Sequence, residues 1–169
     1  MYSENDTVLY GTQGVCTIEE IVRKEFRGSV QKYYLLRPVF DSRSTIFAPC
    51  DSSVTESKMR ELSSQDKINE IIKEVSNEPV DWIDDTNQRR QIFSEALHSG
   101  NSRRILKLAK TIYNHREKLF SQGKNLSSFD TRFLKEAEKI VFEEFAFVLD
   151  LTPSQVLPYI LNSKEQSCN

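Results

Sequence analysis

Short apolar runs alternate with turn residues in the part of the chain before about position 56. Val, Ile, Tyr and Thr, which favour strands, dominate these runs, and Gly11, Gly14 and Gly28 lie between them. The runs read TVLYG, GVCTIEEIV, KYYLLRPVF and STIFAPC. A few short strands in so few residues must curl into a small barrel to bury their inward faces. Because Pro38 and Pro49 cannot donate to a strand ladder, we expect each at a strand end or an exposed edge. The pattern predicts an all-β domain over residues 1–56 with an edge strand available.

Apolar residues recur at helical spacing in the rest of the chain. The pattern predicts about five helices, which begin near Ser63, Thr86, Asn101 or Ser102, Ser127 and Thr152. Ser63 and Asp66 have capping-box spacing, and Thr152-Pro153-Ser154-Gln155 opens the last helix. On the second of these helices we expect Ile92, Phe93, Ala96 and Leu97 to face inward. The predicted fold is therefore two-domain α+β: a small β barrel, a compact helical domain over residues 57–165, and a disordered tail over residues 166–169.

Composition narrows the possible functions. The chain has 169 residues, of which 38% are hydrophobic, and no apolar stretch approaches the roughly 18 residues that cross a bilayer. Its three cysteines lack CxxC spacing and it has only two histidines, so we expect no metal site, no disulfide framework and no His-based catalytic centre. Phosphate-binding and hydrolase motifs are absent. The adjacent carboxylates Glu143 and Glu144 are expected on a solvated surface. We expect a non-enzymatic, cytoplasmic protein with no catalytic residues, cofactor, membrane association or small-molecule substrate.

Positive charge is concentrated in the middle of the helical domain. Although the net charge of the chain is −2, residues 86–135 hold 11 Lys and Arg against three acidic residues, a net +8. Projecting the helix after Asn101 at 100° per residue places its basic residues, with the exception of Arg116, on the face opposite its apolar ones. The basic residues at its start are Arg103, Arg104, Lys107 and Lys110. Few acidic residues offset them, so we interpret this face as a ridge that contacts phosphates, with an ordinary solvated face as the alternative.

Trp82 is the only tryptophan of the chain. It lies after Pro79 and before the second predicted helix, and two interpretations of it remain open. It is a partly buried anchor between helices, or it is exposed and stacks on bases beside the basic ridge.

Several short segments follow one another in a characteristic order. The β part has Asn5-Asp6-Thr7-Val8-Leu9-Tyr10-Gly11, then Tyr33-Tyr34-Leu35-Leu36 and Thr45-Ile46-Phe47-Ala48-Pro49. The helical part has a Pro-then-Trp entry, the paired arginines Arg89 and Arg90, and Leu97-x-Ser99-Gly100-Asn101. In this order the segments resemble the CarD/CdnL family of bacterial transcription regulators. The resemblance implies that the first domain is a Tudor-like (SH3-like) barrel, shared with the polymerase-binding module of transcription-repair coupling factors.

The resemblance also implies two partners. The barrel would bind the RNA polymerase β subunit by adding its edge strand to a strand of that subunit, through Thr45, Ile46, Phe47 and Pro49, with Lys24 beside them. The helical domain would contact promoter DNA, at the minor groove and the phosphate backbone, near the upstream edge of the transcription bubble. Trp82 would act there as a wedge that hinders reannealing, with Arg89 and Arg90 counted among the DNA-binding residues. Such a protein would regulate open-complex stability and lie on the nucleoid through its polymerase.

Two alternatives from other classes remain. The acidic residues around Trp82 favour a polymerase-bound adaptor whose helical domain binds another protein. An aromatic-cage reader of modified lysine would need Tyr10, Tyr33 or Tyr34 to converge, and adjacent strand residues point to opposite faces.

Overall fold

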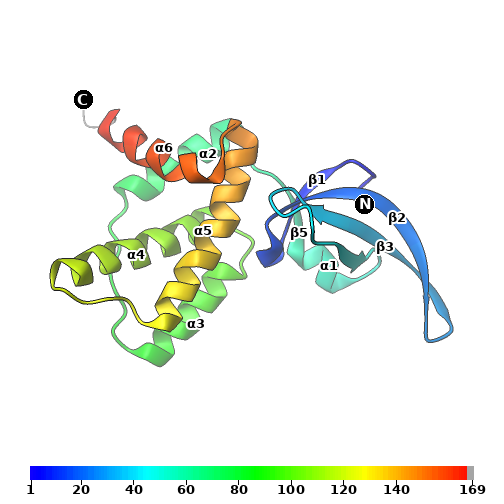
Figure 1. Ribbon diagram of the computed structural model, residues 1–169, viewed down its shortest axis with the longest axis horizontal. Coiled ribbons are helices and arrows are strands. Elements are labelled where there is room, and N and C mark those ends of the chain that lie inside the picture. The colour runs from blue at the N-terminus through cyan, green and yellow to red at the C-terminus, as the bar shows by residue number, and fades with distance from the viewer. Residues whose placement is uncertain (167–169) are drawn as a thin grey trace. The chain divides into compact units, whose positions relative to one another are not determined.

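Two compact units make up the computed structural model of the protein, which describes residues 1–166 (Figure 1). The first unit is Met1–Leu62, and the second begins at Ser63. The two-domain α+β prediction is confirmed. The division lies six residues after the predicted one, because helix α1 (Ser53–Lys58) and strand β5 (Met59–Glu61) belong to the first unit. Of the predicted tail, Gln166 is the last residue of a helix, and 167–169 lie outside the described residues.

The first unit is built on one antiparallel sheet with strand order β4-β3-β2-β1-β5. Its other strands are β1 (Thr7–Tyr10), β2 (Val15–Phe26), β3 (Ser29–Pro38) and β4 (Ile46–Pro49), and the 3-10 turn Gly11–Gln13 separates β1 from β2. The sheet curves over a core that includes Val8, Ile18, Tyr34, Leu36 and Ala48. Within residues 1–62, β4 and β5 remain unpaired with each other, so the sheet keeps two edges instead of closing fully as a barrel.

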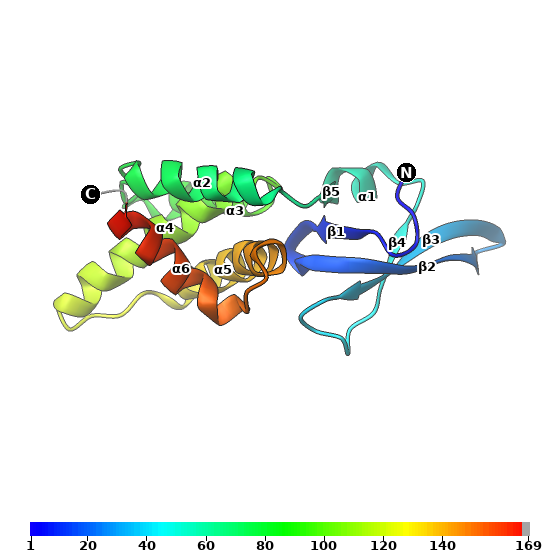
Figure 2. The same cartoon turned by 90° about the horizontal axis from the view of Figure 1, so that it is seen from above.

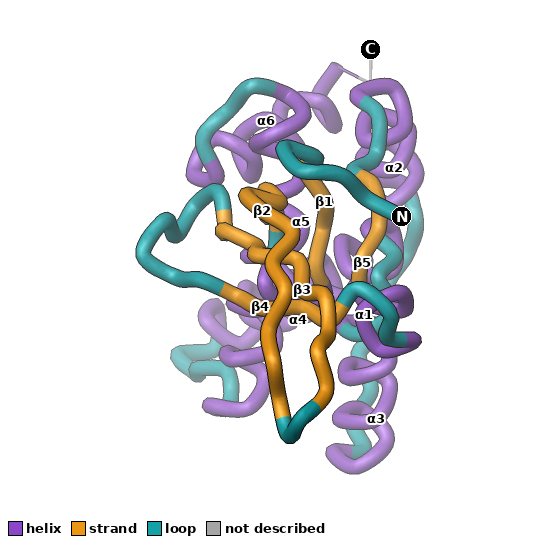
Figure 3. Tube along the Cα trace, turned by 90° about the vertical axis from the view of Figure 1, so that its right-hand side faces the viewer, coloured by secondary structure: helices purple, strands orange, loops and turns teal. Residues whose placement is uncertain are grey.

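The long β2–β3 hairpin extends beyond the other strands of its sheet (Figure 3). Its two turn residues are Arg27, with φ 52°, and Gly28, with φ 77°. Positive φ at both central residues is what a tight two-residue hairpin requires. Pro38 and Pro49 are the last residues of β3 and β4, as expected from their missing N–H groups.

Between residues 63 and 166, the second unit consists of five helices: α2 (Gln65–Asn77), α3 (Thr86–Leu97), α4 (Ser102–Ser121), α5 (Ser128–Leu149) and α6 (Pro153–Gln166). Asn101 and Ser127 cap α4 and α5 as predicted, each accepting from the backbone N–H of the third residue of its helix. Two details of the prediction are wrong. The cap of α2 is Ser64, whose side chain accepts from the Lys67 backbone N–H, and Ile92 is 40% exposed. Ile92 lies away from the stripe of Phe93, Ala96 and Leu97 that packs inward.

Helix α5 runs beside both α4 and α6 in the middle of this unit (Figure 2). This central position overturns the surface prediction for Glu143 and Glu144, both of which are buried. Glu144 is fully enclosed, and its carboxylate accepts from the Ser63 backbone N–H at 2.9 Å and from the Ser102 hydroxyl at 2.5 Å. Hydrogen bonds to both helix starts replace the water that this carboxylate loses. Glu144 therefore ties the starts of α2 and α4 to α5.

Candidate functional sites

Strand β4 exposes one edge of the first unit's sheet. The Cys50 backbone N–H donates to the Lys32 carbonyl at 2.9 Å, which fixes which β4 residues face β3. Because successive residues of a strand turn their backbone groups to opposite sides, Ala48 and Ile46 also face β3 and Phe47 faces the free edge. Pro49 lies at a free-edge position too, where its missing N–H costs no ladder bond. The edge therefore offers the N–H and carbonyl of Phe47 to an incoming strand.

Side chains predicted to bind polymerase gather beside this edge. Phe47 is 42% exposed, and the Lys24 ammonium lies 3.3 Å from the centroid of its ring, a cation–π contact between β2 and β4. The register places Leu35 opposite Phe47 and Tyr33 opposite Pro49. Leu35 and Tyr33 therefore lie on the same outer face of the sheet as Phe47, and both side chains are half-buried. Thr45 is exposed and Ile46 half-buried. The edge thus combines free backbone groups with an apolar strip and one cation.

Arg89 does not lie on the surface of the helical unit, where we predicted a phosphate contact. Its side chain is 9% exposed and forms an ion pair with Asp130, the Nε–Oδ1 distance being 3.0 Å. The same guanidinium donates to the carbonyls of Ile83 at 2.9 Å and Asp84 at 3.1 Å. Asp130 also accepts from the Ser127 hydroxyl at the start of α5. Arg89 therefore joins α3, α5 and the segment before α3, and its charge is used inside the unit.

Trp82 is half-buried and packed on three sides. Its ring stacks on His115 of α4 with centroids 3.6 Å apart and planes 5° apart. Phe93 meets it edge-on at 5.8 Å, and the Arg89 guanidinium lies 4.8 Å from its centroid. These contacts match the anchor interpretation. They come from residues far along the chain, which is why periodicity alone left both interpretations open.

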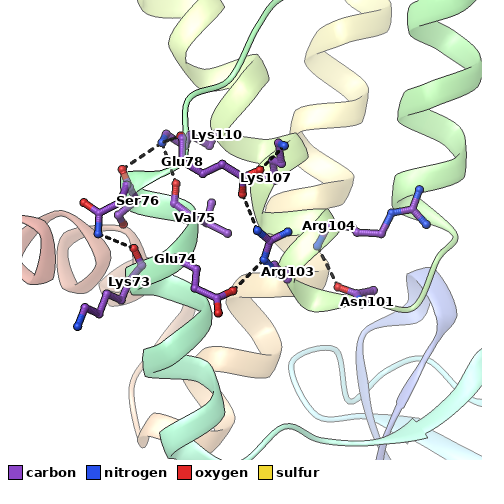
Figure 4. A network of polar contacts seen from close by, with 11 residues as sticks. Lys73, Glu74, Val75, Ser76, Glu78, Asn101, Arg103, Arg104, Lys107 and Lys110 are labelled. Atoms are coloured by element: carbon purple, nitrogen blue, oxygen red, sulfur yellow. Dashed lines mark hydrogen bonds and ion pairs between the residues drawn. The ribbon is translucent and has the colours of Figure 1, made fainter.

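The predicted basic ridge on α4 meets carboxylates at the end of α2 (Figure 4). Arg103 pairs with Glu74 at 2.9 Å and with Glu78 at 2.7 Å, and Lys107 pairs with Glu78 at 2.5 Å. The hydrogen bond from Lys107 is the main cause that lowers the pKa of Glu78. Lys110 donates to three carbonyls where α2 ends. Three of the four ridge residues therefore have partners within the unit.

Two of the predicted DNA-binding cations, Arg90 and Arg104, are exposed and form no ion pair with another described residue. Among residues 1–166, the guanidinium of Arg104 has neither a hydrogen bond nor an ion pair, and Figure 4 shows it pointing away from the network of Arg103. Arg90 lies with its guanidinium 4.5 Å from the centroid of the Phe129 ring. Sequence reasoning missed Phe129, since nothing in the spacing relates it to α3.

Comparison with known families bears on the first unit. Residues 2–63 match the model of the CarD-like/TRCF RID domain. The first unit is thus similar to this family over nearly its whole length, and we refer to it as the RID domain. The match confirms the resemblance where β1 to β5 carry it, and it ends where the helical unit begins. A search of curated proteins gave no significant match.

The tyrosines of the RID domain do not form an aromatic cage. Tyr34 is buried, and its hydroxyl accepts from the Tyr2 backbone N–H at 3.3 Å. Tyr33 lies on the other face, where its hydroxyl donates to Gln31. Tyr10 packs against the core. The arrangement gives no support to the lysine-reader alternative.

Within residues 1–166, no three His, Cys, Asp or Glu side chains are grouped so as to hold a metal ion. No helix there has the length and apolar character needed to cross a bilayer.

The buried ion pair yields a prediction for stability. Arg89→Met should lower the free energy of unfolding by about 3–5 kcal/mol, because Asp130 would stay buried without its cation. Urea unfolding followed by far-UV circular dichroism measures this loss. The exposed neighbour provides the control: Arg90→Met should change the free energy by less than about 0.5 kcal/mol. Equal effects of the two substitutions would contradict the structural role of Arg89.

The Trp82–His115 stack yields a prediction for pH. Burial is the main cause that lowers the pKa of His115 from its ordinary value of 6.5, and Arg89 acts in the same direction while Asp130 opposes it. Near and below that value, His115 binds a proton more readily in the unfolded chain than in the folded one. The contribution of neutral His115 to the free energy of unfolding is therefore full above about pH 6.5 and is lost as the pH falls. The unfolding free energy should therefore decrease on acidification toward about pH 5.5 more in the wild type than in His115→Gln. His98→Gln, which changes the exposed histidine, should keep the wild-type dependence; an unchanged dependence in His115→Gln would refute the assignment.

Proposed function

We propose that this protein is a bacterial transcription regulator without enzymatic activity, and that its RID domain binds the RNA polymerase β subunit. The observation that carries the proposal is the free edge of β4 in a domain that matches the CarD-like/TRCF RID family. Strand addition satisfies backbone donors and acceptors on both partners, while side chains next to the edge select the partner. Here Phe47 and Lys24 occupy that position, so the contact has an apolar centre with one positive charge.

The helical unit is proposed to contact promoter DNA near the upstream edge of the bubble and so to alter open-complex stability. Arg90 and Arg104 support this part best, because within residues 1–166 neither guanidinium has to leave a carboxylate to meet a phosphate. Arg103 and Lys107 would have to leave Glu74 and Glu78 to do so. Trp82 would act as a wedge only if it left its stack on His115. The protein would be cytoplasmic and reach the nucleoid on its polymerase.

The adaptor alternative gains support from the same contacts. Of the seven residues predicted to bind DNA, Arg89, Arg103, Lys107 and Lys110 are engaged within the helical unit. A unit whose cations serve mainly to hold its own helices together is suited to binding another protein. The response of DNA affinity to salt separates the two functions, since only phosphate contacts release counterions.

The strand-addition mechanism predicts a specific effect of proline at the edge. Phe47→Pro removes the N–H that faces the incoming strand but leaves the bonds from β4 to β3, so it should weaken binding to the purified polymerase β subunit at least about tenfold. Biolayer interferometry with the full chain measures this affinity. Phe47→Ala serves as the matched variant: it keeps the N–H and should lose less affinity than Phe47→Pro. Wild-type affinity in a folded Phe47→Pro variant would exclude pairing through this edge.

The DNA contact predicts a change in salt dependence. Arg104→Glu should flatten the slope of log affinity against log salt by about 0.9 for one lost phosphate contact, and Arg90→Glu should act in the same way. Fluorescence anisotropy with a promoter fragment gives the slope. Lys139→Glu makes the same charge change on an exposed residue of α5 and should leave the slope near the wild-type value. If the wild type shows no salt-dependent binding, the adaptor function replaces the DNA function.

A further inference from the structure

An apolar cavity of about 110 Å³ opens among helices α2, α4, α5 and α6. Its walls include Leu106, Ala109, Tyr113, Phe142, Leu157 and Ile160. Of the residues that line it, only Lys110 and the two residues whose carbonyls accept from it, Val75 and Ser76, take part in the sites described above. For comparison, an engineered cavity of about 150 Å³ with similar lining stays dry and binds benzene. The volume therefore suits a small molecule with a single ring and is too small for a helix of a partner protein.

Glu138 of α5 is the one carboxylate among the described residues that line this cavity. Its side chain is half-buried, and within residues 1–166 it has no hydrogen bond and no ion pair. Burial raises its pKa, and the charge of Arg116 opposes that effect only in part. A partly dehydrated carboxylate without a donor is unfavourable, so a ligand that offers a donor would gain free energy at this position.

The cations nearby do not supply that donor. An ammonium group has three N–H donors, and Lys110 lies within hydrogen-bond distance of three carbonyls, those of Val75, Ser76 and Glu78, at 2.8, 3.1 and 2.6 Å. The carbonyls at the end of α2 thus use all three N–H donors of Lys110. Lys164 lines the rim with its side chain exposed, and Arg116 acts on Glu138 only through its charge. Lys110 and Lys164 line the same cavity and Arg116 acts on Glu138, so a cationic ligand would meet positive charge there and a neutral donor is favoured.

We propose that this cavity binds a small neutral aromatic alcohol, whose ring packs between α4 and α6 and whose hydroxyl donates to the Glu138 carboxylate. The apolar walls supply the hydrophobic part of the affinity, and the single carboxylate fixes the orientation. Such a molecule would be a ligand of the helical unit and not a substrate.

Phenol and toluene provide the matched probes, because they share one ring and differ in the hydroxyl donor. Nuclear magnetic resonance titration of the full chain should show both probes shifting the amides of the lining residues. In Glu138→Leu, the preference for phenol over toluene should fall about tenfold, the usual effect of losing a hydrogen bond to a charged group. Since the substitution removes a half-buried carboxylate without a partner, the variant should fold.

Glu136→Gln is the control, since residue 136 points about 200° away from residue 138 around α5. It should keep the wild-type preference for phenol. An equal preference in wild type and Glu138→Leu would overturn the role of Glu138, and shifts that map outside the cavity residues would overturn the site itself. Either failure would leave polymerase binding by the RID domain untouched, because the cavity lies wholly in the helical unit.

Discussion

The arrangement of the helical unit depends on the buried ion pair between Arg89 and Asp130. A guanidinium that is 9% exposed must be almost fully hydrogen-bonded, and here Asp130 and the carbonyls of Ile83 and Asp84 meet that need. These bonds hold the segment before α3 against the helices, which in turn fixes Trp82 against His115. The position of the tryptophan is therefore a consequence of where a positive charge is buried.

Acidic and basic residues that lie in separate segments of the sequence pair with each other in the folded helical unit. The segment before residue 86 has an excess of acidic residues and the next segment an excess of basic ones. When α2 and α4 pack, Glu74 and Glu78 meet Arg103 and Lys107. Exposed pairs of this kind contribute little to stability, but they satisfy cations that would otherwise be free for phosphates. The net charge summed over a sequence segment therefore overstates the positive charge left free on the surface. Among residues 1–166, Arg104 is the ridge residue whose guanidinium has no such partner.

Signals between neighbouring residues predicted the helices and strands well. Contacts between residues far apart in the sequence could not be predicted. Asn101, Ser127 and Thr152 mark helix starts because capping involves only neighbouring residues, and Gly28 marks a hairpin for the same reason. Glu144 looked like a surface residue because its partners Ser63 and Ser102 lie far away in sequence. The same limit applies to the candidate sites: helical projection placed Arg103 and Lys107 on one face but had no means to find the acidic residues that face them.

The two units differ in how much of their recognition depends on side chains. At the β4 edge, the N–H and carbonyl of Phe47 are supplied by any residue other than proline, so partner binding can persist while the flanking side chains vary. In the helical unit, contact with DNA would rest on individual guanidinium groups such as those of Arg90 and Arg104, and one substitution would remove each. The fold itself leaves the backbone groups of an edge strand available for pairing. A surface arginine is available to a phosphate only where no carboxylate of the same unit pairs with it. The stronger functional inference for this chain therefore comes from its strand edge, although its charge pattern is the more conspicuous feature of the sequence.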